Sequence, residues 1–363
     1  MSFDNYIHIK WMRRAIKLAF LGKGLTSPNP LVGAVITNKF GDLISEGFHH
    51  KTGMPHAEAM AFDNLKKDPR GGNLYVNLEP CCHEGKTPPC VKRIIKTGIK
   101  KVFVSIKDPD NRVSGKGIKI LRNAGIEVHL GLCETESLEI NKAFIHRNLT
   151  GNSYGILKWA MSIDGRIGLK NGDSKWITNK FSRSKVHSLR AECDAVIIGG
   201  NTFRKDNPLL TTRGLKDKEP LRVVLTKSLN FLEENNLWDC SSARTLVLYD
   251  SSSADETKLK KIPSCVEIEK LPKDNLKHVS KLLANRGCNK VLWECGPSLA
   301  TAAIRNGCIQ ETMTFIAPKI LGGNSAMTPF SDFNFKKMRD VIELKNLRMN
   351  VFDDDIYLTN QMF

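Results

Sequence analysis

The chain has 363 residues, of which 41% are hydrophobic and 26% are charged. This composition is typical of a folded protein, and the length suits two domains better than one core. No run of about 18 apolar residues is present, which excludes a membrane-spanning helix. Lys10, Arg13, Arg14 and Lys17 interrupt the apolar stretches near the N-terminus. This argues against a secretory signal, and a helix packed on the first domain is favoured over a transit peptide.

Lysine and arginine total 55 residues against 38 aspartate and glutamate, so the formal net charge is +17. Such a charge attracts phosphate, either on nucleic acid or on a small phosphorylated substrate. The basic residues are spread along the chain and form no dense block. A generally lysine-rich, solvated surface therefore explains the charge equally well, and composition alone does not decide between these functions.

Short aliphatic or β-branched runs alternate with helical patterns. In chain order the expected elements are helix 5–21, strand 31–36, helix 57–65, strand 73–78, helix 89–96, strand 101–104, helix 116–124, strand 127–130, strand 155–159, helix 183–190, strand 195–198, strand 222–225, strand 245–249, helix 276–285, strand 290–293 and helix 298–306. This alternation predicts an α/β protein with largely parallel sheets. A polar, glycine-containing segment at 147–153 separates a helical stretch from a new strand, which predicts domains 1–147 and 148–363.

Ten cysteines are present, and seven of them are scattered along the chain. A protein of this length does not need them as disulfides, so a reducing, cytoplasmic setting is expected. The other three, Cys81, Cys82 and Cys90, fall within ten residues and lie next to His83. The chemistry is therefore expected near this cluster.

His56 and Glu58 begin a predicted helix, and Cys81 and Cys90 flank a loop after a predicted strand. One imidazole and two thiolates suit Zn²⁺ and leave its fourth position for water. Glu58 can accept a proton from that water and pass it to a departing amine. The order matches the H-x-E…P-C pattern of zinc-dependent base deaminases, although the usual P-C-x-x-C spacing is absent. A closed structural zinc site with Cys82 or His83 as fourth ligand is the alternative.

The segment 79–90, EPCCHEGKTPPC, resembles the signature of the bifunctional deaminase/reductase family of riboflavin biosynthesis, and so do segments 29–33 and 47–58. The resemblance implies hydrolytic deamination of 2,5-diamino-6-(5-phosphoribosylamino)pyrimidin-4-one. It implies one zinc ion on His56, Cys81 and Cys90, with Glu58 as the proton shuttle. The implied substrate contacts of this half are Asn29, His49 and His83 for the pyrimidine and Lys86 for the phosphate.

The second half carries no G-x-G-x-x-G after a strand, so a Rossmann dinucleotide site is not supported. Segments 157–167, 174–178, 187–195, 199–202, 206–213, 294–299 and 317–319 instead resemble the reductase half of the same family. The resemblance covers nearly the whole chain in family order. It implies an N-terminal cytidine-deaminase-like α/β/α sandwich and a C-terminal domain similar to dihydrofolate reductase. The implied reaction is NADPH-dependent reduction of 5-amino-6-(5-phosphoribosylamino)uracil to its ribityl derivative.

The resemblance also implies the binding residues of this second site. The implied substrate contacts are Lys158, Ser174, Thr178, Arg190, Leu210, Arg213 and Glu294. The implied NADPH contacts are Ala160, Trp176, Thr202, Asp206, Gly296, Pro297, Ser298, Leu299, Ala300, Thr301 and Ala302. Gly296 to Ser298 is also a plausible pyrophosphate site from the sequence itself, because free N–H groups point outward where a helix begins.

In the second half, two positions depart from the family. Cys295 stands where relatives usually carry Gly, and Asn207 stands where a second Asp is common. A side chain at 295 would crowd the cofactor if that position required a positive φ or a close backbone approach. The expected effect is on the efficiency of the reductase more than on its identity.

These observations together predict a cytoplasmic, homo-oligomeric enzyme with Zn²⁺ and NADPH, acting on small phosphorylated pyrimidines and not on nucleic acid or membranes. Three alternatives stay open. The first is a deaminase with a degenerate reductase domain. The second is an RNA-editing zinc deaminase, favoured by the positive charge and disfavoured by the missing P-C-x-x-C. The third is a zinc-stabilised binding protein without catalysis.

Overall fold

The computed structural model describes residues 3–82, 88–110, 113–250, 252, 254–272 and 276–362. The chain divides into two compact units, Met1–Gly151 and Asn152–Phe363. The division lies within the polar segment 147–153, where helix α5 (Glu134–Thr150) ends at Gly151 in the left-handed conformation, with a φ of 70°. None of the helices in the described ranges is long and apolar enough to cross a membrane.

The first unit is built on a five-stranded sheet in the order β2-β1-β3-β4-β5. Its elements are α1 (Phe3–Phe20), β1 (Gly33–Thr37), β2 (Leu43–Phe48), α2 (Ala57–Asp63), β3 (Asn73–Leu78), α3 (Cys90–Lys96), β4 (Lys101–Ile106), α4 (Lys116–Asn123), β5 (Glu127–Leu130) and α5. β1 is antiparallel to β2 and β3, whereas β3, β4 and β5 are parallel. This sheet is therefore mixed, and the expectation of a largely parallel sheet was wrong for this unit, because β2 was not recognised.

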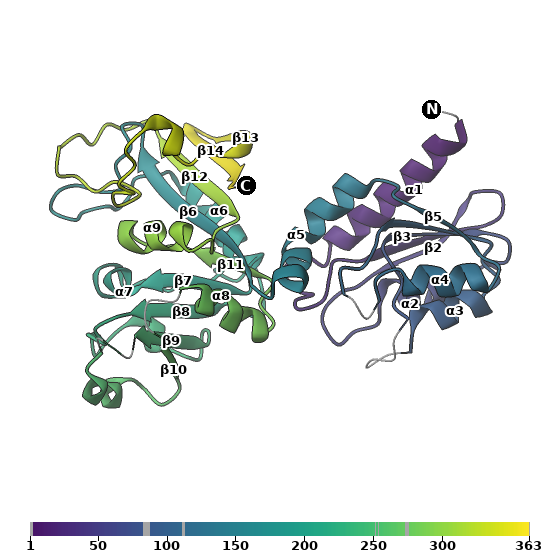
Figure 1. Ribbon diagram of the computed structural model, residues 1–363, viewed down its shortest axis with the longest axis horizontal. Helices are drawn as coiled ribbons and strands as arrows, with labels where there is room; N and C mark the ends of the chain where they lie inside the picture. Colours follow the sequence, from purple (N-terminus) through teal and green to yellow (C-terminus); the bar gives the residue numbers. More distant parts are fainter. Residues whose placement is uncertain are drawn as a thin grey trace. The chain divides into compact units, whose positions relative to one another are not determined.

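Successive residues of the strands face opposite layers of helices. Val35, Tyr75 and Phe103 pack with Met12 and its neighbours on α1, while the alternate strand positions pack against α2, α3 and α4. Figure 1 shows α1 and α5 side by side on one face of the sheet and α2, α3 and α4 on the other. Burial of both faces explains why these strands read as nearly continuous apolar runs. The expected three-layer α/β/α sandwich is confirmed.

The second unit contains a nine-stranded sheet in the order β10-β9-β8-β7-β11-β6-β12-β14-β13. Its elements are β6 (Tyr154–Ser162), α6 (Lys180–Ala191), β7 (Ala195–Gly199), α7 (Gly200–Asp206), β8 (Leu221–Thr226), η1 (Asn236–Trp238), β9 (Thr245–Asp250), η2 (Glu256–Lys261), β10 (Glu267–Leu271), α8 (Leu276–Asn285), β11 (Lys290–Trp293), α9 (Pro297–Arg305), β12 (Glu311–Ala317), η3 (Met338–Asp340), β13 (Lys345–Phe352) and β14 (Asp355–Gln361). Neighbouring strands from β10 to β12 are parallel, and β14 and β13 are added antiparallel.

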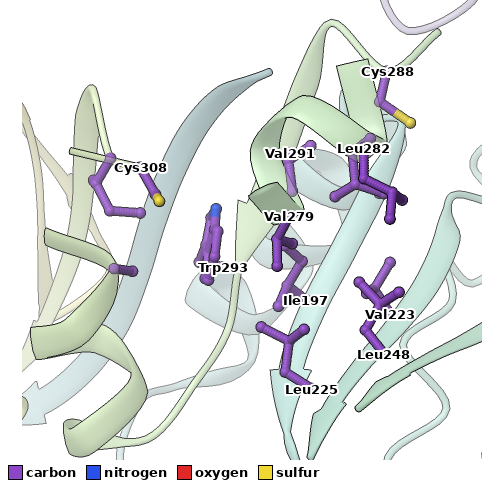
Figure 2. Close-up of a cluster of buried hydrophobic side chains, with 14 of the residues drawn as sticks. Ile197, Val223, Leu225, Leu248, Val279, Leu282, Cys288, Val291, Trp293 and Cys308 are labelled. Atoms are coloured by element: carbon purple, nitrogen blue, oxygen red, sulfur yellow. The ribbon is translucent and has the colours of Figure 1, made fainter. Parts of the chain in front are cut away.

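The core of the second unit lies between this sheet and helices α8 and α9. Figure 2 shows Val279 and Leu282 of α8 directed toward Ile197 and Val223 of the sheet. The adjacent position Val196 is also completely buried, so both faces of the parallel strands are covered. Ligands of open parallel sheets bind at the carboxyl ends of the strands. A ligand site is therefore expected at the loops after β6, β7, β8 and β11.

Candidate functional site

In the first unit, His56, Cys81 and Cys90 come together as a group able to hold a metal ion. Their ligand atoms all lie within 4.8 Å of one another. His56 Nδ1 is 3.5 Å from Sγ of each cysteine. His56 precedes the first residue of α2, Cys81 follows β3 and Cys90 begins α3, so the ends of three elements converge here.

The two sulfur atoms differ in proton affinity because they face each other. Hydrogen bonds from the Cys90 thiol and from His56 hold the pKa of Cys81 well below its usual range, although burial acts in the opposite direction. The Cys90 backbone N–H also donates to Cys81 Sγ over 3.3 Å. The pKa of Cys90 is raised, because its proton is shared with Cys81 and because it is buried. A thiolate, a second thiol and an imidazole form a donor set that fits Zn²⁺ with a position left for a small ligand.

Of the two alternative fourth ligands, the structure describes Cys82 and does not describe His83. Within the described residues Cys82 is not part of the metal group, and its side chain packs against the hydrophobic core of this unit. Burial raises the pKa of the Cys82 thiol, which disfavours the thiolate that a metal requires. His83 lies outside the described residues, as does Lys86.

Glu58 lies on the first turn of α2 and is 4% exposed. Burial raises its pKa to about 7, and the neighbouring Cys81 thiolate contributes. A carboxyl group in this range can both take up and release a proton near neutral pH. A divalent cation at the adjacent group would act in the opposite direction and favour the carboxylate.

Asn29 and His49 lie together beside the metal group. Asn29 Nδ2 is 3.1 Å from His49 Nε2, and His49 Nδ1 is 3.0 Å from the carbonyl oxygen of Pro55. The rings of His49 and His56 are edge to face with centroids 5.8 Å apart. Burial lowers the pKa of His49, so a neutral ring that donates from Nδ1 to Pro55 and accepts from Asn29 satisfies both contacts.

Two buried amides that the sequence did not single out hold the loop that carries Asn29. Asn141 Oδ1 accepts from the Leu31 N–H over 2.8 Å, and its Nδ2 donates to the Leu31 carbonyl over 3.0 Å. Asn77 donates to the same carbonyl over 2.9 Å and accepts from the Gly33 N–H over 2.8 Å. The only local signal was an asparagine inside the apolar run of β3, which alone does not indicate what it would bind.

In the second unit, a cavity of about 1460 Å³ lies at the carboxyl ends of the parallel strands. Most of the residues expected at the second site line it: Lys158, Ala160, Ser174, Trp176, Thr178, Arg190, Thr202, Asp206, Leu210, Arg213, Glu294, Gly296, Pro297, Ser298, Leu299 and Ala302. Ala300 and Thr301 do not line it. Ala300 packs in the core behind α9, and Thr301 Oγ1 exchanges hydrogen bonds with the backbone of Ser331, so neither faces the place expected for a cofactor.

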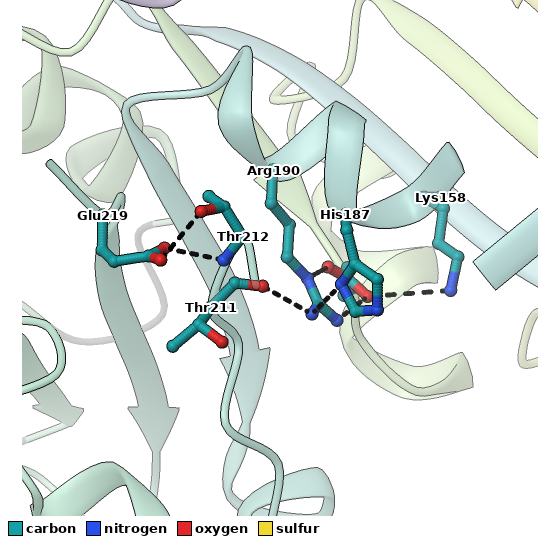
Figure 3. A network of polar contacts seen from close by, with 7 residues as sticks. Lys158, His187, Arg190, Thr211, Thr212 and Glu219 are labelled. Atoms are coloured by element: carbon teal, nitrogen blue, oxygen red, sulfur yellow. Dashed lines mark hydrogen bonds and ion pairs between the residues drawn. The ribbon is translucent and has the colours of Figure 1, made fainter. Parts of the chain in front are cut away.

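A buried ion cluster occupies one wall of this cavity (Figure 3). Arg190 donates to both oxygens of Glu294, at 2.6 and 3.1 Å, and Lys158 Nζ lies 3.6 Å from Glu294 Oε2. The guanidinium also donates to the Thr211 carbonyl over 3.2 Å. Burial disfavours the charge on Glu294, but Arg190 and Lys158 outweigh it and lower its pKa to about 2. Burial lowers the pKa of Lys158, and Glu294 opposes this effect.

The loop between α7 and β8 borders the same wall in an unusual backbone conformation. Leu210 and Arg213 have φ values of 54° and 58°, which non-glycine residues rarely adopt and which often occur at binding sites. Arg222, a fully buried residue that the sequence reasoning missed, donates to the Leu209 carbonyl over 3.5 Å. It also donates to the carbonyls of Asp239 and Ala243 over 2.7 and 2.6 Å. This guanidinium therefore ties the loop to the segment after η1.

The two departures from the family pattern are accommodated. Asn207 ends α7 with a φ of 42°, a conformation that asparagine tolerates, and its Oδ1 accepts from the Asn236 N–H over 2.8 Å. Cys295 is not among the residues with positive φ, and its side chain packs against the core. The backbone at 295 is therefore not strained, whereas a close approach of this side chain to the cofactor stays a prediction, because Cys295 lines the cavity.

Comparison with known proteins connects both units to one family. Residues 6–106 match the cytidine and deoxycytidylate deaminase zinc-binding region, and residues 153–358 match the RibD C-terminal domain. The riboflavin biosynthesis protein RibD of Synechocystis sp. is 43% identical over 97% of this chain and 95% of its own length. The solved structure of Acinetobacter baumannii RibD superposes with a TM-score of 0.89 at 35% identity, covering 99% of both chains.

A second solved structure, from Thermotoga maritima, is described as a diaminohydroxyphosphoribosylaminopyrimidine deaminase/5-amino-6-(5-phosphoribosylamino)uracil reductase. It has a TM-score of 0.89 and 33% identity, covering 99% of this chain and 100% of its own. Identity at this level over the full length exceeds what a shared fold alone requires, and both halves match in order. The chain belongs to the RibD family of riboflavin biosynthesis proteins.

Proposed function

We propose that the chain catalyses two consecutive steps of riboflavin biosynthesis. The first unit deaminates 2,5-diamino-6-(5-phosphoribosylamino)pyrimidin-4-one. The second unit reduces the ribosyl chain of the product, 5-amino-6-(5-phosphoribosylamino)uracil, with NADPH. The observation that carries the proposal is the presence of the two sites in one chain: a three-ligand metal group beside the buried Glu58, and a cavity with the buried Lys158–Glu294–Arg190 cluster.

In the first unit, His56, Cys81 and Cys90 would hold Zn²⁺, which when bound supplies a Lewis acid that lowers the pKa of water. Glu58 takes a proton in this dry site and delivers it to the departing amine. Asn29 and His49 present an amide and a neutral imidazole to the edge of the pyrimidine. His83 and Lys86, outside the described residues, are proposed to contact the pyrimidine and the ribose phosphate.

In the second unit, NADPH supplies the hydride. Gly296 precedes α9 without a side-chain cap on the first N–H groups, so these groups can receive the pyrophosphate. Glu294 already neutralises Arg190, so Arg190 fixes the shape of the cavity wall on the substrate side. Lys158 and Arg213 remain to contact the phosphate or sugar oxygens of the substrate. Ser174, Thr178 and Leu210 complete the substrate side. Ala160, Trp176, Thr202 and Asp206 complete the cofactor side.

The test is incubation of the purified chain with the diaminopyrimidine phosphate, first without and then with NADPH. We expect one zinc ion per chain, ammonia release in the first stage and loss of nicotinamide absorbance only in the second. The E58Q variant is nearly isosteric and should retain zinc while losing ammonia release. Unchanged ammonia release in E58Q would refute the proton-transfer role. Ammonia release without NADPH oxidation would indicate a degenerate reductase.

We further propose a homo-oligomer that acts in the cytoplasm on small molecules and not on nucleic acid. The edge strand β13 exposes Leu347, Met349 and Val351, which alternate along one face and are 63%, 64% and 59% exposed. Edge strands of this kind are usually covered, and a second copy of the chain would do so. Ten free cysteines fit a reducing compartment. Sedimentation of wild type and M349K tests the assembly, and salt-dependent RNA retention would contradict the small-molecule assignment.

A further inference from the structure

Two cysteines of the second unit lie on turns that enter neighbouring strands. Cys240 follows η1 and precedes β9, and Cys265 follows η2 and precedes β10. β9 and β10 are adjacent and parallel, so the segments that enter them reach the sheet at the same edge. Neither cysteine is among the residues that line the cavity, and neither has a role in the two proposed reactions.

The two thiols contact each other and the same piece of backbone. Cys265 Sγ donates over 3.6 Å to the carbonyl of Trp238, which stands two residues before Cys240. The Cys240 thiol in turn forms a hydrogen bond with Cys265. Cys265 is exposed, on a turn closed by the hydrogen bond from the Val266 N–H to the Pro263 carbonyl over 3.0 Å, whereas Cys240 is half-buried. Both cysteines are free thiols that face each other.

We propose that Cys240 and Cys265 form a reversible disulfide, a redox modification site separate from both proposed active sites. The oxidant is a low-molecular-weight disulfide of the glutathione class. The Cys265 thiolate attacks one sulfur of the oxidant, which forms a mixed disulfide and releases half of the oxidant as a thiol. The Cys240 thiolate then attacks Cys265 Sγ, and the other half of the oxidant leaves as a thiol. Two electrons pass from the protein to the oxidant, and the two cysteine protons end on the released thiols.

A buried cation adjoins the pair and favours the reactive form of its thiols. Arg222 donates to the carbonyls of Asp239 and Ala243, on either side of Cys240, over 2.7 and 2.6 Å, and so holds this turn in place. Its Nε has no hydrogen-bond partner in the part of the chain that the structure describes. The guanidinium charge interacts with the sulfur atoms of both cysteines. A positive charge beside a thiol stabilises the thiolate, which is the form that attacks a disulfide.

The order of the two attacks follows from exposure and from the hydrogen bond between the thiols. Cys265 is exposed, so it meets the oxidant first. Burial, followed by the hydrogen bond and the charge of Cys265, raises the pKa of Cys240 to about 11. The contribution of Cys265 ends when its sulfur enters the mixed disulfide, whereas Arg222 continues to favour the Cys240 thiolate. Cys240 is therefore placed to act second, as the resolving thiol.

The disulfide closes a covalent loop over residues 240–265, which contains β9 and η2. A link between segments that already touch in the folded chain restricts mainly the unfolded chain. Oxidation is therefore expected to raise the midpoint of thermal unfolding of the second unit by about 5 °C.

The test is incubation of the full-length chain with oxidised glutathione, followed by alkylation of free thiols and mass spectrometry of tryptic peptides. Cys240 lies in peptide 228–244 and Cys265 in peptide 262–270, and each peptide contains a single cysteine. The linked peptide pair should appear in the wild type and disappear on reduction. C240S should stop at the mixed disulfide of glutathione on Cys265. C133S removes a half-buried cysteine of the first unit and is the matched control, which should form the linked pair as the wild type does.

Thermal unfolding followed by tryptophan fluorescence gives a second readout. The oxidised wild type should unfold about 5 °C above the reduced wild type, whereas the oxidant should not change the midpoint of C265S. The proposal is refuted if both cysteines of the wild type stay thiols, if Cys265 stays in a mixed disulfide, or if it links two chains. A linked pair that lowers the midpoint also refutes it, because the folded chain would then hold the two turns apart. Ammonia release and NADPH oxidation test the proposed function separately, so its failure is distinguishable from failure of this site.

Discussion

Replacement of Glu294 by Gln removes the negative charge at the centre of the buried cluster in the second unit. The carboxylate is held by two bonds from Arg190 and by Lys158 at 3.6 Å, and the side chains of the three residues are 10%, 13% and 18% exposed respectively. Glutamine keeps the shape of the glutamate side chain and one of its two hydrogen-bond acceptor oxygens. It leaves two cations in a desolvated place with no negative partner, which is among the most destabilising changes a single substitution can make.

Two routes give the same magnitude for this change. A carboxyl group whose pKa falls from 4.5 to about 2 on folding is stabilised in its ionised form by about 3 kcal/mol. Removing one partner of a buried ion pair usually costs about 3–5 kcal/mol. Because the pKa is lowered on folding, this contribution is complete above pH 4.5 and is lost as the pH falls toward 2. The difference between wild type and E294Q should therefore be largest near neutral pH and shrink in acid.

The measurement is urea denaturation of the full-length chain at neutral and acid pH. Tryptophan fluorescence reports mainly on the second unit, which contains Trp159, Trp176, Trp238 and Trp293. E267Q is the matched control, because Glu267 pairs with Arg286 at the surface, where an ion pair contributes about 1 kcal/mol or less. If E294Q lost no more free energy of unfolding than E267Q, or if the loss did not depend on pH, the assignment of a fixed buried charge would be wrong.

Three further substitutions test other parts of the molecule. R222M should lower the free energy of unfolding by about 3 kcal/mol or more, because buried carbonyls lose their donor, and should raise the reductase KM while leaving ammonia release unchanged. G47A should destabilise the first unit by about 1–3 kcal/mol in thermal denaturation, since its Cβ would lie 2.5 Å from the Ala61 backbone nitrogen. C295G should leave the Kd of NADPH within about twofold of wild type, because the Cys295 backbone is unstrained; a tenfold improvement would contradict this.

The metal group was predictable because each of its residues lies where a regular element begins or ends. Proline precedes His56, Cys81 and Cys90, and buried aliphatic runs mark the strand before Cys81. Most of the parallel strands, with β10 and β12 as the exceptions, were found because burial of both faces leaves a continuous apolar run. Residues of this kind could be placed from the sequence, because neighbouring residues alone determine where a helix or strand begins and ends.

The missed strands are β2, β10 and β13 at the edges of the sheets, where burial is incomplete, and β12 and β14 inside the second sheet. β12 is buried, but Thr312 and Thr314 interrupt its apolar run. Nearly every residue of β13 is exposed. The alternation of Leu347, Met349 and Val351 is a strand signal that the sequence analysis did not use.

The buried polar residues Asn77, Asn141 and Arg222 were missed for a different reason. These side chains bind backbone groups that are far away in sequence or lie in loops of irregular conformation. The spacing of residues in the sequence does not predict such hydrogen bonds.

Glu58 and Glu294 show why the roles of site residues depend on what surrounds them. Both carboxyl groups are buried, and both lie close to a cysteine in sequence or space. Burial and, to a smaller extent, the neighbouring Cys81 thiolate raise the pKa of Glu58 to about 7. Glu294 faces two cations, and its pKa falls to about 2, so it stays ionised and fixes their positions. Burial beside the sulfur atoms thus raises the proton affinity of Glu58 when the metal group is empty, whereas burial beside Arg190 and Lys158 keeps Glu294 ionised.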